Sequence, residues 1–345
     1  MKYDDLKQGI LKDDQTLHRF LETNRIYGFS LAIVEDYNIS NTVIFGIKNS
    51  DIMLQAASIS KSIFSFTVMK LFELGLVDIN ENLAPIIKSA FPKLLMGIDF
   101  IITYQDLLNH TSGLNIHGFS GYEKNQTMPT LKQTLMGEKP SNSLCLRFDY
   151  SPRSRFSYSG GAYQLAQYLI ESQMKESYKS LVERLVLNPL GMNHSIMPLS
   201  RKDINRSRIA QAWSSHDTPI KGGYIFYPEL AAAGLWTTPN DLARFGIEMM
   251  KALQGRSMHL SKESAERMMT LPLIEAAEYG TGFRVVKQHN SSLFGHSGDN
   301  VGYHASMLFN PAKGSGIVVM INTDIGEEIP YMISSNWMKN ERKVI

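Results

Sequence analysis

Residues 55–66 read QAASISKSIFSF, and they place a serine three positions before a lysine where an apolar, helix-like run begins. A serine in the first turn of a helix lies at the positive end of the helix dipole, where a developing oxyanion is stabilised. Residues three apart on a helix share a face, so we expect the Lys61 amine to reach the Ser58 hydroxyl. Burial lowers the pKa of an amine and allows it to accept the serine proton. Ser58 and Lys61 are therefore a candidate nucleophile and base.

The same four residues also have an ordinary structural interpretation. Serine is a favoured helix N-cap and lysine is a good helix former, so this spacing arises by chance in many chains. Ser172-Gln173-Met174-Lys175 repeats the spacing within a polar helical face, and we assign it no catalytic role. The motif alone does not decide between the two interpretations, and the rest of the chain must do so.

The composition is that of an ordinary globular protein, and the near-neutral charge favours a small or neutral ligand. The chain has 345 residues, is 43% hydrophobic and 20% charged, and is long enough for one large domain or two closely joined ones. A formal net charge of +2 and the lack of a Lys/Arg block give no reason to expect a nucleic-acid partner. Cys145 is the only cysteine, which excludes an internal disulfide. The oligomeric state is left undetermined.

Several classes of protein are disfavoured by the motifs that are missing. No run reaches the ~18 apolar residues of a membrane span, and the start MKYDDLKQGILKDDQ has no apolar signal region. We expect a cytoplasmic protein, or a periplasmic or secreted one if a leader has been trimmed. The nine histidines lack metal-ligand spacing, so no metal or organic cofactor is expected. GxxxxGK[ST], GxGxxG and GxSxG are absent, which disfavours nucleotide binding and the α/β-hydrolase fold.

Strand patterns occupy both ends of the chain and helical patterns occupy the middle. Residues 27–34 and 42–47 are predicted strands around a turn, and an apolar run from Ser58 to Leu74 predicts a buried helix. Residues 76–270 are predicted to be rich in helices. The final part predicts four strands and a closing helix, at 283–287, 292–295, 303–310, 316–322 and 330–338.

This order predicts an α+β fold. Its mostly antiparallel sheet is assembled from the two chain ends and flanked by the terminal helices. We predict a discontinuous α/β sandwich domain of residues 1–75 and 271–345, with a helical domain of residues 76–270 inserted between them. The active site is expected between the two domains.

Two further stretches form an ordered triple with Ser58 to Lys61. Residues 156–163 read FSYSGGAY and run into an apolar helix, and residues 294–299 read FGHSGD at the end of a strand. The triple resembles the SxxK, YxN and KTG-type elements of the serine β-lactamase and penicillin-binding-protein superfamily. The third element reads HxG in the branch close to class C β-lactamases and their esterase and D-peptidase relatives.

Three other segments extend this resemblance across residues 27–322. Residues 102–114, ITYQDLLNHTSGL, look like the branch's ITxxxLLxHTSGL segment, and residues 188–192, NPLGM, look like its PLGM turn. Residues 227–245 are similar to its AAGGLxxTxxDLxRF block. Each segment alone is unspecific, whereas six landmarks in the family's order are highly specific.

The resemblance implies roles for the residues that match the family's motifs. Ser58 would be the nucleophile, and Lys61 and Tyr158 would share the general base and acid work. Which of the two takes the serine proton is left open, although a lysine ammonium beside a tyrosine favours phenolate. His296 would lie near the substrate carboxylate or the Tyr158 hydroxyl.

Backbone groups and smaller contacts complete the expected site. The oxyanion hole would consist of the backbone N–H groups of Ser58 and Asp299. Ser297 and Gly298 would allow the substrate backbone to approach the strand closely. His117 is expected to face the substrate. His110 and Thr111, by contrast, are expected to brace a turn near the site.

One departure from the family pattern affects the expected activity. Gly160 replaces the asparagine of YxN, so efficient β-lactam hydrolysis is doubtful. We predict a serine hydrolase that forms an acyl-enzyme at Ser58 and acts on a small ester or amide, as an esterase, β-lactamase or D-aminoacyl peptidase. One alternative is an acyltransferase that uses the same serine. Another is a non-catalytic penicillin-binding-like sensor or binding protein, which the Gly160 departure keeps open.

Overall fold

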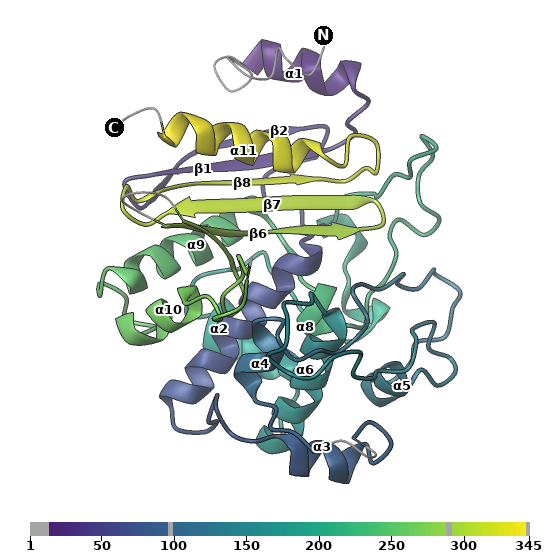
Figure 1. Ribbon diagram of the computed structural model, residues 1–345. Coiled ribbons are helices and arrows are strands. Elements are labelled where there is room, and N and C mark those ends of the chain that lie inside the picture. The colour runs from purple at the N-terminus through teal and green to yellow at the C-terminus, as the bar shows by residue number, and fades with distance from the viewer. Residues whose placement is uncertain (1–13, 96–98, 276, 288–291, 343–345) are drawn as a thin grey trace.

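A computed structural model describes residues 14–95, 99–275, 277–287 and 292–342. Its central element is a six-stranded antiparallel sheet in the order β2-β1-β8-β7-β6-β5, which joins strands from both ends of the chain (Figure 1). The strands of this sheet are β1 (Phe29–Glu35), β2 (Asn38–Phe45), β5 (Arg284–Lys287), β6 (Ser292–Asn300), β7 (Tyr303–Asn310) and β8 (Ser315–Ile321). A short ribbon pairs β3 (Leu54–Gln55) with β4 (Trp236–Thr237).

Helices surround the sheet on both faces and fill the middle of the chain. Their bounds are α1 (Asp14–Thr23), α2 (Ser60–Glu73), α3 (Ala84–Ala90), α4 (Tyr104–Leu108), α5 (Leu131–Met136), α6 (Gly160–Met174), α7 (Tyr178–Val182), α8 (Leu230–Ala233), α9 (Pro239–Leu253), α10 (Lys262–Met269) and α11 (Ile329–Arg342). This arrangement confirms the predicted α+β fold with a mostly antiparallel sheet. None of the helices in the described ranges is both long and apolar enough to cross a bilayer.

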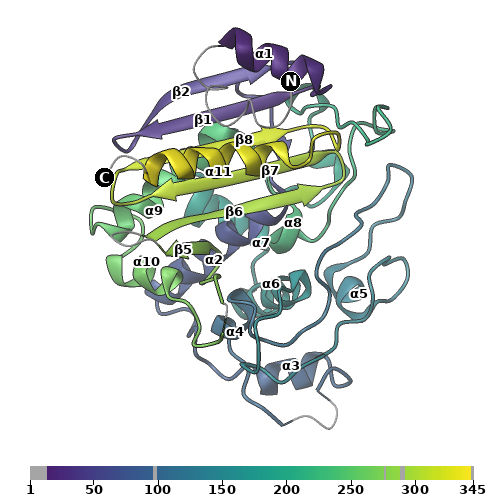
Figure 2. The same cartoon turned by 45° about the horizontal axis from the view of Figure 1, so that its top comes forward.

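The terminal helices α1 and α11 cover one face of the sheet, as predicted (Figure 2). Leu17 and Leu21 of α1 and Ile333 of α11 are buried in one apolar cluster with the alternating residues Leu31 and Val319 of β1 and β8. Period-two alternation therefore divides the sheet residues between two cores. The larger core lies on the opposite face and includes residues from α2, α6 and α9.

The predicted division into a sandwich of residues 1–75 and 271–345 and an insertion of residues 76–270 stays a prediction. Helix α9 lies within the predicted insertion, yet it packs against β1 and β8 of the sheet (Figure 1). Thr238 caps this helix by accepting the N–H of Asp241, with Pro239 at the first helical position.

Three predicted boundaries differ from the structure for identifiable reasons. β2 begins at Asn38 because Asp36 and Tyr37 adopt φ of 49° and 61° and close a two-residue hairpin. β6 continues to Asn300, beyond the predicted end at residue 295, because its pairing with β7 runs to the next hairpin. Ser58 lies in a 3₁₀ turn, Ala57–Ile59, that precedes α2 rather than in the α-helix itself.

Candidate active site

Ser58 is the point at which a buried segment reaches the surface. It is partly exposed, whereas every other residue from 52 to 69 is buried. Ala57 before it has a φ of 47°, a left-handed conformation that is uncommon for alanine and costs energy. The Ala56 N–H donates to the Leu235 carbonyl at 2.9 Å, and the Ser60 hydroxyl donates to the Ala57 carbonyl at 2.6 Å. These bonds hold the turn that presents Ser58.

Lys61 lies within hydrogen-bond distance of the Ser58 hydroxyl. Its Nζ is 3.0 Å from Ser58 Oγ and donates to the Ala232 carbonyl of α8 at 2.8 Å. The side chain is 1% exposed, and this burial lowers the pKa of Lys61 to about 7. Ser172 and Lys175, which share the sequence spacing, are both exposed. The structure thus distinguishes the two motifs by burial.

Tyr158 lies beside Lys61, with its ring centroid 5.0 Å from Lys61 Nζ. Burial raises the pKa of Tyr158 well above its ordinary value, although a hydrogen-bonding interaction with Ser58 acts in the opposite direction. The phenol is therefore protonated near neutral pH, which contrasts with the expectation that the lysine would favour a phenolate. A protonated phenol is suited to donate a proton rather than to accept one.

His110 braces the chain on both sides of Tyr158, as predicted. Its Nδ1 accepts the Ser159 N–H at 3.0 Å, and its carbonyl accepts the Ser157 N–H at 2.9 Å. Thr111 belongs to the same turn and donates to the Asp106 carboxylate, which also receives two hydrogen bonds of 2.8 Å from Arg153. The His110 ring also lies against Tyr158 itself, with 4.1 Å between the ring centroids, so these contacts together fix the position of Tyr158.

Strand β6 approaches the serine so closely that only glycine fits at position 298. A Cβ placed on Gly298 would lie 2.2 Å from the Ala56 carbonyl oxygen and 2.9 Å from the Ser58 nitrogen. Asn300 and Tyr303 flank the two-residue turn to β7 and form a hydrogen-bonded pair. Along β6, every second residue before Asn300 then also forms a hydrogen-bonded pair with β7, and the residues between them do not. The N–H of Asp299 and the C=O of Ser297 therefore point away from β7. This geometry is compatible with the predicted oxyanion hole, which stays a prediction.

The end of β6 is further fixed by a histidine held between two carboxylates. His304 Nδ1 is 2.8 Å from Asp299 Oδ1, and its Nε2 is 3.0 Å from Asp324 Oδ1. Burial lowers the pKa of His304, but the hydrogen bonds and charges of the two aspartates outweigh it and raise the pKa to about 9. A cationic imidazolium therefore clamps the Asp299 side chain at neutral pH.

His296 lies near Lys61 but hydrogen-bonds to a residue that the motifs did not indicate. Its Nε2 is 2.9 Å from the Tyr279 hydroxyl, and its Nδ1 bonds to the Ser297 carbonyl. Its ring centroid is 6.4 Å from that of Tyr158. Burial, followed by the charge of Lys61, lowers the pKa of His296 to about 3. His296 is therefore neutral, and both of its nitrogen atoms are engaged.

The loop that carries His117 covers the start of α6. The His117 ring lies 4.8 Å from the Tyr158 ring, and its carbonyl accepts the Gly160 N–H at 3.2 Å. A Cβ on Gly160 would lie 2.7 Å from Phe119 Cε2. The space beside Gly160 is thus filled by an aromatic ring, and no side-chain amide is present at that position.

Most of the predicted site residues converge around Ser58. Lys61 and Tyr158 contact the serine, Gly298 packs on its backbone, and His117 lies beside Tyr158 with the two rings tilted. The Ser297 side chain is exposed, and alternation along β6 places it on the face opposite His296. Sequence reasoning missed Tyr279, because it lies in an irregular segment with no recognisable motif.

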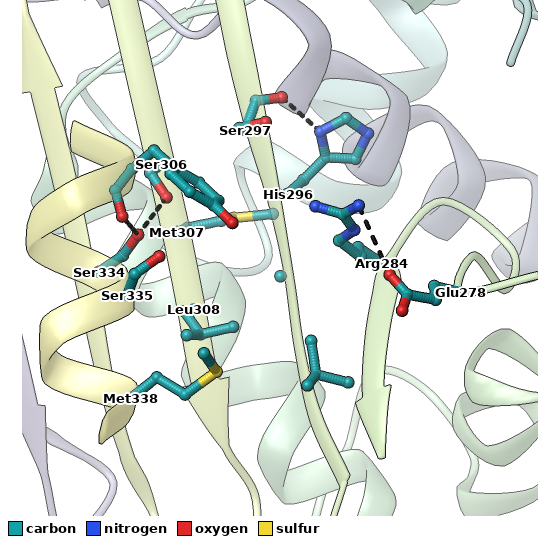
Figure 3. Close-up of a pocket in the computed structure, with 13 residues that line it drawn as sticks. Glu278, Arg284, His296, Ser297, Ser306, Met307, Leu308, Ser334, Ser335 and Met338 are labelled. Atoms are coloured by element: carbon teal, nitrogen blue, oxygen red, sulfur yellow. Dashed lines mark hydrogen bonds and ion pairs between the residues drawn. The ribbon is translucent and has the colours of Figure 1, made fainter. Parts of the chain in front are cut away.

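A separate pocket of about 250 Å³ lies on the α11 side of the sheet (Figure 3). Arg284 and Met338 line it, and Ser306 and Ser334 share a hydrogen bond of 2.7 Å there. His296 and Ser297 of β6 are among its lining residues, whereas Ser58 is not (Figure 3). This pocket therefore adjoins β6 but does not contain Ser58.

Comparison with known proteins links most of the chain to one family. A family model described as Beta-lactamase matches residues 14–331. A penicillin-binding protein homologue from Pyrococcus abyssi superposes with a TM-score of 0.77 at 22% identity, over 99% of this chain and 78% of that one. The D-amino acid amidase from Ochrobactrum anthropi superposes with a TM-score of 0.74 at 20% identity, over 99% of this chain and all of that one. These likenesses establish the fold.

Curated relatives match at similar identity but are longer. A putative D-alanyl-D-alanine carboxypeptidase from Escherichia coli is 23% identical over 212 residues, which cover 52% of this chain and 46% of that protein. The chain spans between 46% and 60% of the length of this protein and of two fungal unguisins hydrolases.

Proposed function

The chain belongs to the beta-lactamase family, and we propose that it is a serine hydrolase that forms an acyl-enzyme at Ser58 and hydrolyses a small ester or amide. One observation carries this proposal: the buried Lys61 amine lies 3.0 Å from the hydroxyl of Ser58, and Ser58 is the one residue between positions 52 and 69 that is partly exposed. A pKa of about 7 leaves much of this amine neutral at physiological pH, so it is able to accept a proton.

The proposed reaction assigns the base to Lys61 and the acid to Tyr158. Neutral Lys61 takes the Ser58 proton while Ser58 Oγ bonds to the substrate carbonyl carbon. The backbone N–H groups of Ser58 and Asp299 stabilise the resulting oxyanion. Tyr158 then protonates the leaving group as its bond to the acyl carbon breaks, and the Lys61 ammonium returns a proton to Tyr158. Water repeats the sequence on the acyl-enzyme, giving its proton to Lys61 and releasing Ser58 with a proton.

We propose that the substrates are esters or D-aminoacyl amides without a terminal carboxylate. The name of one structural neighbour, D-amino acid amidase, supports D-aminoacyl amide substrates. His296 is neutral and both of its nitrogen atoms are engaged, so it offers no cation to a carboxylate. Phe119 at Gly160 leaves no side-chain amide to bind an acylamino group, which disfavours turnover of β-lactams.

The test compares matched substrates and matched serines. The protein is given p-nitrophenyl acetate and, separately, two dipeptides. D-alanyl-glycinamide ends in a neutral carboxamide, whereas D-alanyl-glycine ends in a carboxylate, and the two are otherwise identical. We expect hydrolysis of the ester and of the glycinamide, with much slower hydrolysis of D-alanyl-glycine. Ser58→Ala should abolish the activity, and Ser172→Ala, at the exposed copy of the motif, should retain it.

Other outcomes would redirect the proposal. Turnover that persists in Ser58→Ala would reject the nucleophile, and preference for D-alanyl-glycine would reject the substrate class. A large rate increase when an alcohol or amine acceptor is added would favour the acyltransferase alternative. A single stable adduct without turnover would favour a binding protein.

A further inference from the structure

We propose that Tyr279 is a positioning residue of this active site: through His296 it holds the Ser297 carbonyl, and with it the part of β6 that lies against Ser58. The inference rests on the proposed function, because it concerns the strand that would stabilise the oxyanion. Tyr279 matches none of the motifs that indicated the other site residues.

The turn that carries Tyr279 is anchored on both sides. The Gly280 N–H donates to the Phe283 carbonyl at 2.9 Å, and the Thr281 N–H donates to the Met268 carbonyl of α10 at 2.8 Å. A Cβ on Gly280 would lie 2.2 Å from the Met268 carbonyl oxygen, so the turn approaches α10 as closely as glycine allows. The Tyr279 side chain is 5% exposed and its ring lies 4.5 Å from that of His110. Its hydroxyl therefore has little freedom to move.

The two hydrogen bonds of His296 specify where its proton lies. A carbonyl oxygen only accepts, so the bond to Ser297 requires the proton on Nδ1 (Figure 3). Nε2 of the neutral ring is then an acceptor, and the Tyr279 hydroxyl at 2.9 Å donates to it. Tyr279 thus selects the tautomer that binds Ser297. In the opposite tautomer, Nδ1 would lose its proton and repel the carbonyl.

The Ser297 carbonyl is a sensitive point in the strand. It points away from β7, on the same side of β6 as the Asp299 N–H. Strand β5 pairs only with residues 292–295 of β6, so it does not hold this segment. Rotation of the Ser297 peptide would move Gly298, whose backbone touches Ala56 and the Ser58 nitrogen. The bond from His296 therefore provides the support that a neighbouring strand would otherwise give.

The charges around His296 favour its neutral form. The charged and titratable groups that face it are Lys61 on α2, His110, Arg284 on β5 and Asp299 on its own strand, with Tyr279 bonded to it. The cations outnumber the single carboxylate, and burial acts in the same direction. Removal of the Tyr279 hydroxyl would leave Nε2 without this donor, while burial and the charge of Lys61 still keep the ring neutral. The two neutral tautomers would then compete, and the one with its proton on Nε2 cannot donate to the Ser297 carbonyl.

The experiment compares Tyr279→Phe with Tyr178→Phe, which removes another buried tyrosine hydroxyl, that of Tyr178 on α7. Hydrolysis of p-nitrophenyl acetate is measured from pH 5 to 9, and nitrogen NMR of the imidazoles reports the tautomer of His296. In Tyr279→Phe we expect kcat to fall about tenfold with little change in KM, the factor that one hydrogen bond of about 1.4 kcal/mol supplies. The His296 ring should stay neutral in both proteins, and its nitrogen signals should change from those of the Nδ1-protonated tautomer in the unaltered protein to those of a mixture of the two neutral tautomers.

Two results would overturn the inference. Wild-type kcat and an unchanged imidazole spectrum in Tyr279→Phe would show that the hydroxyl does not position His296. An equal loss of kcat in Tyr178→Phe, with the same pH profile, would show that both changes act only through stability. Failure of the unaltered protein to hydrolyse any ester in a Ser58-dependent way would instead reject the proposed function, and the positioning role with it. The Ser58→Ala comparison separates that failure from a failure at Tyr279 alone.

Discussion

The pH dependence of acylation is the most direct consequence of the buried Lys61. The amine must be neutral to accept the Ser58 proton, and burial lowers its pKa to about 7 from a reference of 10.5. At pH 7 about half of the molecules then have a neutral amine, whereas a pKa of 10.5 would leave about one in 3,000. Burial therefore increases the population of the active base by about three orders of magnitude.

The perturbation is a change of pH from 8.5 to 5. Below the pKa the neutral fraction falls about tenfold for each pH unit, so the acylation rate should be about half-maximal near pH 7 and about 100-fold lower at pH 5. Rates are measured from the initial burst of p-nitrophenol, followed at its isosbestic wavelength so that ionisation of the product does not distort them. The burst isolates acylation from the later release of the acyl group.

Matched variants show whether this profile belongs to Lys61. Lys61→Met should remove the burst at every pH, and Lys175→Met, at the exposed copy of the motif, should leave both rate and profile unchanged. An acylation rate that is flat from pH 5 to 8.5, or that keeps rising above pH 9.5, would refute the assignment of Lys61 as a base with a depressed pKa.

Substitutions at three buried positions separate stability from catalysis. The pKa of Lys61 is lower in the folded protein than in the unfolded chain, so the unfolded chain binds more protons between about pH 7 and 10.5. The free energy of unfolding therefore rises with pH in this range. Lys61→Met should remove this pH dependence in thermal unfolding, and it should stabilise the inactive protein by up to about 4–5 kcal/mol at pH 7. Gly298→Ala places a Cβ 2.2 Å from the Ala56 carbonyl oxygen, so we expect kcat to fall more than about tenfold with a loss of about 1–3 kcal/mol of stability; unchanged kcat would contradict the close approach of β6. Gly160→Ala meets Phe119 Cε2 at 2.7 Å and should destabilise the fold by about 1–2 kcal/mol in denaturant titration, and the double change with Phe119→Ala should cost less than the sum of the single changes.

The sequence predicted those features that depend on local periodicity or on motif order. The apolar run after Ser58 predicted the burial of α2, and the i, i+3 spacing predicted the contact between Lys61 and Ser58. The covering of the sheet by the terminal helices followed from strands at both ends of the chain. In these cases the residues that determine the structure are near one another in sequence or belong to an ordered set.

Features that depend on tertiary contacts were beyond sequence reasoning. β6 continues through Gly295 to Asn300, although this glycine-rich stretch has low strand propensity, because pairing with β7 outweighs local preference. The partner of His296 depends on how the turn at Gly280 docks on α10, which no pattern encodes. Burial decides whether Tyr158 is a phenol or a phenolate, and the burial of this side chain can be seen only in the packed structure.

The most direct test of the central claim is to locate the acyl group on the protein. The chain is mixed with p-nitrophenyl acetate, quenched in acid during the burst, and analysed by intact mass and peptide mapping beside Ser58→Ala and Ser172→Ala. We expect one acetyl group on Ser58 in the unaltered protein and in Ser172→Ala, and none in Ser58→Ala. An acetyl group on another residue, or equal labelling of Ser58→Ala, would contradict a nucleophilic role for Ser58.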